Sequence, residues 1–238
     1  MNKYLCLLMI LIFAISVSFA EDIYELLQND NLNLNLDGSF KELCRGGVPP
    51  PLLKLDSYSQ VIQNSFNYRG EDDLSGEFGL VLCGKNLIFF GEIQDNIPLY
   101  QTREKPVNPK WWKITYGADG VCLLLSKSEK EDDVNRIFFN FGSQGLVPVI
   151  LLDSIPGKKT GTSSGELAIE KTKNGYSFEA QIPFDELSEG LLNGDCFLEI
   201  LLFDMDGSEE TYKVMALNSK VEADLEKPSK WLKAIIKK

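Results

Sequence analysis

The chain has 238 residues and a formal net charge of −11 at pH 7, and it contains no histidine. So acidic a chain is a poor partner for nucleic acid or for an anionic membrane, but it is compatible with neutral or cationic ligands. The absence of histidine excludes the Ser-His-Asp triad, the Cys-His pair, histidine zinc sites and histidine-ligated haem.

The first twenty residues have the features of a secretory signal peptide. Lys3 supplies the positive charge, residues 4–15 form a short apolar core, and Ser18-Phe19-Ala20 is a small-x-small cleavage signal. We expect cleavage after Ala20 and a secreted or periplasmic protein. The apolar core is shorter than a spanning helix usually needs. No later segment is apolar enough to cross a membrane, so we expect no membrane insertion. Without Lys3 the net charge becomes −12.

Four cysteines follow the predicted cleavage site: Cys44, Cys83, Cys122 and Cys196. In an exported protein they allow two disulfides, in three possible connectivities. The last three lie at the edges of apolar runs, where a reduced cysteine is an ordinary small core residue. The sequence therefore leaves open whether two, one or no disulfides form, and the irregular spacing does not indicate a thiolate metal site.

The N-terminal part is sparse in regular structure. Residues 22–28 suit one or two helical turns, and residues 29–37 alternate polar residues with Leu as an extended edge segment does. Three prolines exclude regular structure in residues 45–51. We expect residues 21–70 to form an extension that wraps a single β domain over residues 71–238.

Short apolar or alternating runs dominate the chain beyond residue 70 and predict strands. The predicted strands are residues 78–83, 87–93, 121–125, 136–141, 147–152, 166–170, 176–182, 196–203 and 211–217. In residues 176–182 apolar and polar side chains alternate, which places one face of the strand in the core. About ten short strands with turn signals and a few short helices predict an all-β fold, an antiparallel β-sandwich.

Six segments occur in an order that resembles carbohydrate-binding module family 9 and its DOMON-like relatives. They are residues 73–96, 111–126, 136–142, 175–187, 194–207 and 227–235. The most specific pair is GYSFEAQIPFDEL followed by GDCFLEILLFDMDG. Over residues 73–236 the resemblance implies a jelly-roll-like sandwich that holds a sugar at one end, often with structural calcium and without catalysis. The loop over residues 94–112 shares only its Trp pair with the family.

Two adjacent tryptophans, Trp111 and Trp112, are the leading candidates for sugar contacts. Aromatic rings stack on the apolar faces of sugar rings, and a loop position leaves one ring face free. Adjacent residues of an extended segment point in opposite directions, so we expect one ring in the site while the other caps the core. Asp95 and Asn96 either contact sugar hydroxyls or cap the loop, and Tyr116 is a further candidate contact.

The remaining candidates are charged. Arg136 is a candidate contact, and Glu179 either binds a ligand or pairs with Arg136 across the sheet. Asp204 and Asp206 resemble a small calcium loop, since hard oxygen ligands at i and i+2 suit Ca²⁺. The alternative for this loop is an acidic hairpin turn. Structural calcium is thus the one cofactor that the sequence suggests.

We predict a secreted, monomeric, non-catalytic protein that binds a mono- or oligosaccharide or a cell-surface polymer. The alternative is a structural or protein-interaction sandwich of the same fold without a sugar site. A glycoside hydrolase would need two carboxylates about 5–10 Å apart in a cleft, and no spacing singles out such a pair. DOMON-type haem binding would leave Met205 or another methionine to ligate iron alone.

Overall fold

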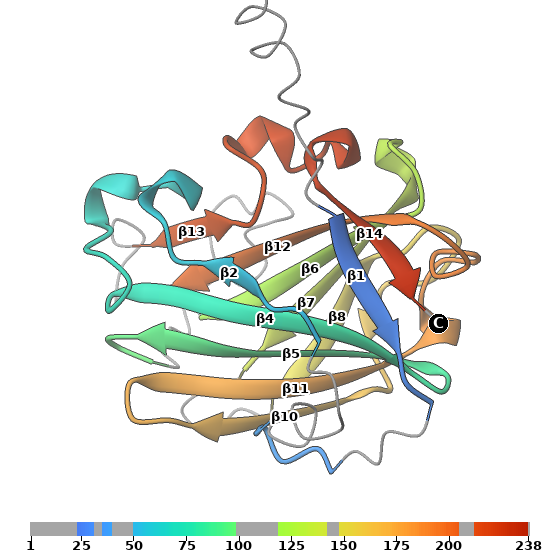
Figure 1. The fold of residues 1–238 in the computed structure, drawn as a ribbon, viewed down its shortest axis with the longest axis horizontal. Helices are drawn as coiled ribbons and strands as arrows, with labels where there is room; N and C mark the ends of the chain where they lie inside the picture. The colour runs from blue at the N-terminus through green and yellow to red at the C-terminus, as the bar shows by residue number, and fades with distance from the viewer. Residues whose placement is uncertain are drawn as a thin grey trace, which may run out of the picture.

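The fold is an assembly of short strands and three-residue 3-10 turns, seen here in a computed structural model (Figure 1). The structure describes residues 23–30, 35–39, 50–98, 119–141, 148–204 and 212–237. Within these ranges no helix has the length and apolar composition needed to cross a membrane.

The strands include all nine predicted ones and several that were not predicted. In chain order they are β1 (Ile23–Gln28), β2 (Leu53–Leu55), β3 (Val61–Gln63), β4 (Leu74–Cys83), β5 (Asn86–Asp95), β6 (Gly120–Ser126), β7 (Val134–Asn140), β8 (Val149–Ser154), β9 (Gly161–Thr162), β10 (Glu166–Lys171), β11 (Gly175–Pro183), β12 (Cys196–Asp204), β13 (Lys213–Ala216) and β14 (Leu232–Lys237). The 3-10 turns are η1 (Tyr58–Gln60), η2 (Ser65–Asn67), η4 (Glu131–Asp133), η5 (Phe184–Glu186), η6 (Glu222–Asp224) and η7 (Pro228–Lys230).

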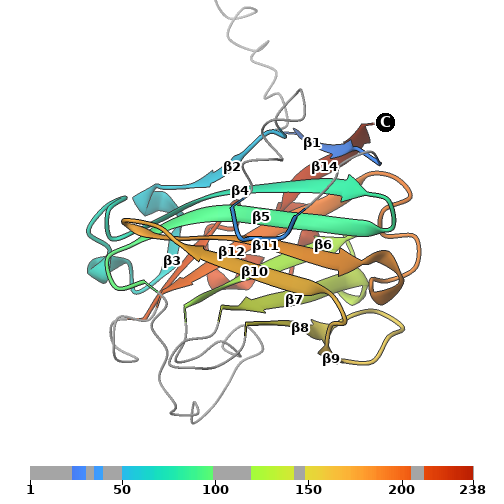
Figure 2. The ribbon, with the colours of Figure 1, turned by 90° about the horizontal axis from the view of Figure 1, so that it is seen from below.

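The strands form one curled sheet whose two halves face each other as layers (Figure 2). The order is β10-β11-β5-β4-β1-β14-β12-β6-β7-β8-β9, with β2 added to β4 and β13 added to β12 and β3. One layer holds β10, β11, β5 and β4, and the other holds β12, β6, β7 and β8. Because β8 also contacts β10, the two ends of the sheet meet. The predicted β-sandwich is confirmed.

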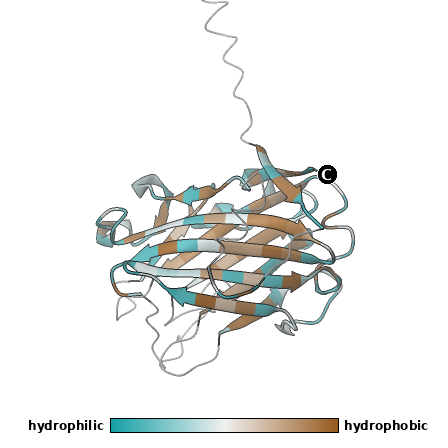
Figure 3. Ribbon diagram, turned by 60° about the horizontal axis from the view of Figure 1, so that its bottom comes forward, coloured by the Kyte–Doolittle hydropathy of each residue, from teal (hydrophilic) through white to brown (hydrophobic). Residues whose placement is uncertain are grey.

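Aromatic rings join the two layers in the core. Phe89 on β5 lies 5.2 Å from Phe178 on β11 and 5.0 Å from Phe139 on β7, measured between ring centroids. The alternation predicted for residues 176–182 is confirmed, since Tyr176, Phe178 and the two further apolar residues of this run are fully buried. Each buried Phe contributes about 1.5–3 kcal/mol of burial free energy. Hydrophobic residues accordingly follow the strands of both layers (Figure 3).

A second apolar cluster lies on the outer face of the β12–β6–β7 layer. Its buried members include Leu124, Phe138 and Phe203, and Trp231 packs against them from the C-terminal segment. Central strands covered on both faces are apolar on both faces.

Cys122 belongs to this second cluster and Cys196 to the inner core, and both are free cysteines. The option of two disulfides is therefore wrong, and burial raises the pKa of the Cys196 thiol to about 12.

The expectation of helical turns over residues 22–28 is wrong, because this segment forms β1. Tyr24 and Leu26 alternate with more exposed neighbours and are buried, which is the period of a strand. The Tyr24 hydroxyl accepts a hydrogen bond of 2.9 Å from the Leu80 amide. β1 runs parallel to both β14 and β4, so the sandwich is not wholly antiparallel.

A short N-terminal strap, residues 35–39, is fixed over the outer face of β11 and β10. Glu179 Oε2 accepts hydrogen bonds from the amides of Asp37 (3.1 Å) and Gly38 (3.0 Å). The Ser177 hydroxyl donates to the Gly38 carbonyl at 2.7 Å. Gly38 has φ +89°, and a Cβ there would lie 2.5 Å from the backbone of Glu170. The strap therefore needs glycine at this position and the Glu179 carboxylate beneath it.

Glu199 has a matching role on the outer face of the other layer. Its Oε2 accepts hydrogen bonds from the Ser219 amide (2.7 Å) and hydroxyl (2.8 Å), and its Oε1 accepts from the Asn218 amide (3.0 Å). Burial raises the pKa of Glu199, and the hydrogen bonds oppose that shift. The carboxylate fixes the turn through which β13 leads to the C-terminal segment.

We predict that Glu179→Ala lowers the free energy of unfolding by about 2–4 kcal/mol, because two backbone amides lose a charged acceptor. Urea unfolding of the variant and of the wild type measures the change. The control is Glu170→Ala, which removes an exposed carboxylate on the neighbouring strand. A loss no larger than that of Glu170→Ala would contradict the role of Glu179 as an anchor.

Candidate functional site

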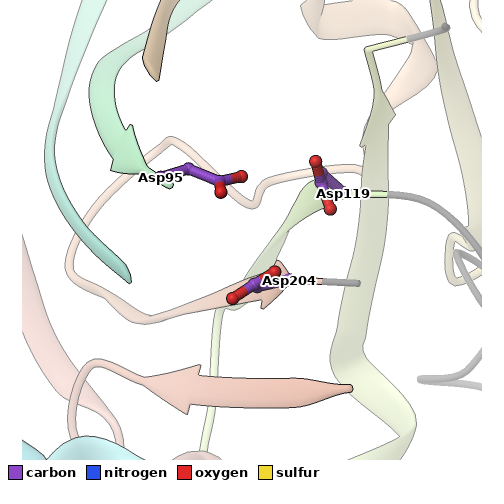
Figure 4. A group of neighbouring side chains, drawn as sticks. All are labelled: Asp95, Asp119 and Asp204. Carbon is purple, nitrogen blue, oxygen red and sulfur yellow. The ribbon is translucent and has the colours of Figure 1, made fainter. Parts of the chain in front are cut away.

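Three buried carboxylates meet at one end of the sandwich. Asp95 is the last residue of β5, Asp204 the last of β12, and Asp119 directly precedes β6. In Figure 4 their side chains come from three separate elements toward a common centre. β6 pairs with β12 through Gly120 and Phe203, while β5 belongs to the other layer. The cluster thus joins the two layers where their strands end.

The cluster is compact and buried. One carboxylate oxygen of each residue lies within 4.8 Å of the others, and the exposed fraction of Asp95, Asp119 and Asp204 is 2%, 2% and 0%. Burial disfavours the charged form of a carboxylate, and like charges at this separation repel each other. Such a group is stable only with positive charge, hydrogen-bond donors or protons beside it.

Lys213, the first residue of β13, supplies one positive charge from inside the fold. Its ammonium lies 2.7 Å from Asp204 Oδ2 and 2.9 Å from Asp73 Oδ2, and the lysine is 1% exposed. An ammonium shared by two carboxylates compensates part of the desolvation of all three groups. Asp204 is therefore held in place from the side of β13.

Asp73 and Asp95 also fix the chain where it leaves β5. Asp73 Oδ1 accepts a hydrogen bond of 2.8 Å from the Asn96 side chain, and Asp95 Oδ1 accepts one of 2.7 Å from the Ile97 amide. Asp73 Oδ2 accepts a further bond of 3.0 Å from the Arg69 amide. These contacts determine the path of the backbone at residues 95–97.

Tyr176, near the start of β11, carries a buried phenol that is subject to the field of the carboxylates. The ring is fully buried, and among the described residues its hydroxyl has no hydrogen-bond partner. Burial raises the pKa of Tyr176 well above its usual value, and the charges of Asp119, Asp95 and Asp204 raise it further. The negative charges of the three carboxylates therefore act on this buried hydroxyl and favour its neutral form.

The donor set suits a hard cation such as Ca²⁺. Within the part of the chain that the structure describes, the grouped ligands are all hard oxygens and include no thiolate, and the sequence has no histidine, so nothing here favours a softer metal. Ca²⁺ binds oxygens at 2.3–2.6 Å, so two ligands on opposite sides of one ion stand about 4.6–5.2 Å apart. The carboxylate oxygens, none of which lies more than 4.8 Å from another, are close enough together to share one such ion.

The sequence predicted only part of this group. It paired Asp204 with Asp206, which lies outside the described residues, whereas the structure brings Asp204 together with Asp95 and Asp119. Asp119 was not predicted as a site residue. Its only signal was the Asp119-Gly120 step at the start of a strand, which does not indicate the neighbours that the sheet provides.

The predicted aromatic contacts, Trp111, Trp112 and Tyr116, lie outside the described residues. Their place along the chain is nevertheless informative. The segment that carries them starts after β5 and ends before β6, so both of its ends are joined to the carboxylate cluster. The role of the three rings stays a prediction.

Arg136 and Glu179 do not belong to this cluster. Arg136 Nε lies 3.3 Å from Asp153 Oδ2 on the adjacent strand β8, and Glu179 holds the N-terminal strap. The suggested ion pair between Arg136 and Glu179 is wrong. Phe178 on β11 and Phe139 on β7 lie in the core between the layers. Because side chains alternate along a strand, Glu179 and Arg136 point away from the core, each to the outer face of its own layer.

Comparison with known proteins shows the fold. No protein-family model matches the chain, and no curated protein matches it. A carbohydrate-binding module of family 9 from Caldicellulosiruptor kristjanssonii, solved with cellotriose, is similar with a TM-score of 0.55 and 14% identity. The alignment covers 90% of this chain and 93% of that one. The same kind of module solved with glucose gives a TM-score of 0.54 and 13% identity, covering 90% and 95%.

A third solved structure supports the same fold. It is a candidate carbohydrate-binding protein from Bacteroides uniformis, with a TM-score of 0.59 and 11% identity, covering 91% of this chain and 99% of that one. The similarity to family 9 carbohydrate-binding modules that the sequence indicated is therefore confirmed at the level of the fold.

We predict that Lys213→Met lowers the free energy of unfolding by about 3–5 kcal/mol, because it leaves buried carboxylates without their shared ammonium. Thermal and urea unfolding measure the loss. Lys220→Met, which removes an exposed lysine from a nearby loop, is the control and should change stability by less than about 0.5 kcal/mol. Equal effects of the two variants would show that Lys213 is not needed to hold the cluster.

Proposed function

We propose that the chain is a secreted or periplasmic, non-catalytic carbohydrate-binding protein whose sugar site is at the carboxylate end of the sandwich. One observation carries the proposal. The segment predicted to contact the sugar through Trp111 or Trp112 starts and ends at the buried group of Asp95, Asp119 and Asp204. The family 9 modules of the same fold, solved with cellotriose and glucose, support a sugar as the ligand class.

In this proposal, different residues contact the sugar and hold the loop in place. Aromatic rings bind a sugar ring through its apolar face, and that contact gains most when the loop is held in place beforehand. Asn96 Nδ2 is committed to Asp73, and Asp95 Oδ1 to the Ile97 amide. We assign Asp95 and Asn96 the role of fixing the base of the loop, and we assign the ring contact to one of Trp111 and Trp112, with Tyr116 as a further contact.

We further propose that Asp95, Asp119 and Asp204 hold a Ca²⁺ ion. When bound, such an ion supplies positive charge that joins β5 of one layer to β12 and β6 of the other. The protein's own residues prepare the place: Lys213 orients Asp204, and the Ile97 amide orients Asp95. The role is structural, because it stiffens the end from which the loop leaves.

The burial of the carboxylates supports binding without catalysis. A glycoside hydrolase presents one carboxyl group as an acid and another as a base or nucleophile to the same sugar. Here the three carboxylates are at most 2% exposed. Groups so enclosed suit a structural role better than contact with a glycosidic bond.

We predict that the wild type binds at least one neutral mono- or oligosaccharide on a glycan array. Trp111→Ala or Trp112→Ala should weaken that binding by at least about tenfold, which corresponds to about 1.4 kcal/mol. Isothermal titration with the best array ligand measures the affinities, and unchanged melting temperatures show that the variants are folded.

The control for this experiment is Ile97→Ala, which removes an exposed aliphatic side chain at the same end. It should retain the wild-type affinity within about twofold. If the wild type binds no sugar on the array, the proposal fails and the alternative of an interaction sandwich without a sugar site takes its place.

We predict that millimolar Ca²⁺ raises the melting temperature of the wild type and that EDTA reverses the rise. A free ligand at 100 times its Kd stabilises by about 2.7 kcal/mol, which is roughly 5–10 °C for a domain of this size. Asp119→Asn should remove the response, while Asp185→Asn, which changes an exposed carboxylate, should keep it. No calcium response in the wild type would overturn the proposed ion site.

A further inference from the structure

Residues 58–68, which contain η1, β3 and η2, differ in composition from the rest of the chain. A quarter of all residues are charged, yet none of these eleven is. The segment instead combines the aromatic residues Tyr58, Phe66 and Tyr68 with four side-chain amides and two serines. In so acidic a protein, an uncharged surface segment suits a neutral ligand.

Two of its rings are displayed to solvent. Phe66 is 79% exposed and Tyr58 61%, the two highest values among the exposed large hydrophobic residues of the described ranges. The others in that group are aliphatic. The half-buried Tyr68 ring lies 6.3 Å from the Tyr58 ring and is tilted to it by 51°. The segment therefore presents open aromatic faces with amides and hydroxyls between them.

Hydrogen bonds fix the segment in this form. A capping box joins Ser57 and Gln60 at the start of η1. The Tyr68 hydroxyl donates to the Asp56 carbonyl at 3.1 Å, and the Tyr58 hydroxyl donates to the Ser65 hydroxyl at 3.3 Å. Because hydrogen bonds already fix the segment that carries the rings, binding of a ligand would cost little free energy for ordering it.

The segment lies at the same end of the molecule as the carboxylate cluster. β3 pairs with β13, and the Asn64 side chain donates to the Tyr212 carbonyl at 2.6 Å, next to Lys213. The chain then continues through Arg69, whose amide donates to Asp73. In Figure 1 the cyan turns of the segment lie beside β13 and the start of β4.

We propose that Tyr58 and Phe66 form a second contact surface for a neutral polysaccharide. This inference rests on the proposed sugar-binding function and extends it from one sugar unit to a chain. Exposed rings stack on the apolar faces of sugar units, and flanking amides and hydroxyls suit sugar hydroxyl groups. A protein partner would favour a contiguous apolar centre, whereas these rings are separated by polar residues.

Two contacts on one chain make binding depend on length. A monosaccharide occupies only the loop at the carboxylate cluster, while a longer chain engages the aromatic surface as well. The second contact then occurs at the high effective concentration set by the first. Polysaccharides should consequently bind more tightly than their constituent sugar.

The test compares the wild type with Tyr58→Ala/Phe66→Ala. Affinity electrophoresis through gels containing cellulose derivatives, xylan, mannan, β-1,3-glucan or soluble starch measures polysaccharide binding, and titration with the matching monosaccharide measures the other contact. We expect at least one polysaccharide to retard the wild type. The double variant should bind that polysaccharide roughly five- to tenfold more weakly, with unchanged affinity for the monosaccharide.

Two variants serve as controls. Tyr58→Phe keeps the ring face but removes the hydrogen bond to Ser65, so it should retain most of the polysaccharide affinity that Tyr58→Ala/Phe66→Ala loses. Ile23→Ala/Val221→Ala removes two exposed aliphatic side chains elsewhere on the surface and should also bind like the wild type.

Different outcomes overturn different claims. If the wild type binds the monosaccharide but Tyr58→Ala/Phe66→Ala does not weaken polysaccharide binding, only the second surface is refuted. If the wild type binds neither, the proposed function fails together with it. If the double variant alters self-association on size exclusion while polysaccharide binding is unchanged, the rings serve contact between protein chains and the sugar surface is overturned.

Discussion

The burial of like charges at one end of the sandwich is the constraint on which the arrangement of this end depends. Asp95, Asp119 and Asp204 come from both layers, and none of them can be buried as a charged group without compensation. Lys213 shares its ammonium between Asp204 and Asp73, and Asp73 in turn holds the Asn96 side chain. These contacts connect the strand ends to one another, so ion pairs and hydrogen bonds hold the two layers together at the end of the hydrophobic core.

Buried glutamates solve a related problem on the two outer faces. A sheet covered on both faces needs chain segments fixed over it, and a segment without regular structure has unpaired amides. Glu179 accepts amides from the strap at residues 35–39, and Glu199 accepts amides from residues 218–219. Both glutamates alternate along their strands with core residues. The pleat thus places an apolar side chain inward and a carboxylate acceptor outward from consecutive positions.

Most strands could be predicted from the sequence because their information is local. The alternation in residues 176–182 and the Asn174-Gly175 turn specify a hairpin without reference to the rest of the chain. β1 could not be found in this way, because its strand state comes from pairing with β14 and β4, which are distant in sequence. The cluster has the same cause: Asp204 was noticed for its spacing to Asp206, but its partners are set by sheet register. For Tyr58 and Phe66 the sequence shows the uncharged segment, and only the fold shows that the rings face solvent.

A sandwich has two ends, and its fold alone does not select the one that binds a ligand. At the end beyond Ser126, Asn135 and Ser188 exchange hydrogen bonds of 2.8 and 2.9 Å, and Glu186 accepts from Ser163 and from the Ser164 amide. Those polar groups are used to close loops. At the other end the carboxylates of Asp95, Asp119 and Asp204 lie together, which closing a loop does not require. The exposed rings of Tyr58 and Phe66 lie on the neighbouring segment. This asymmetry of charge and aromatic exposure is the physical ground for our proposal that a sugar binds at the carboxylate end.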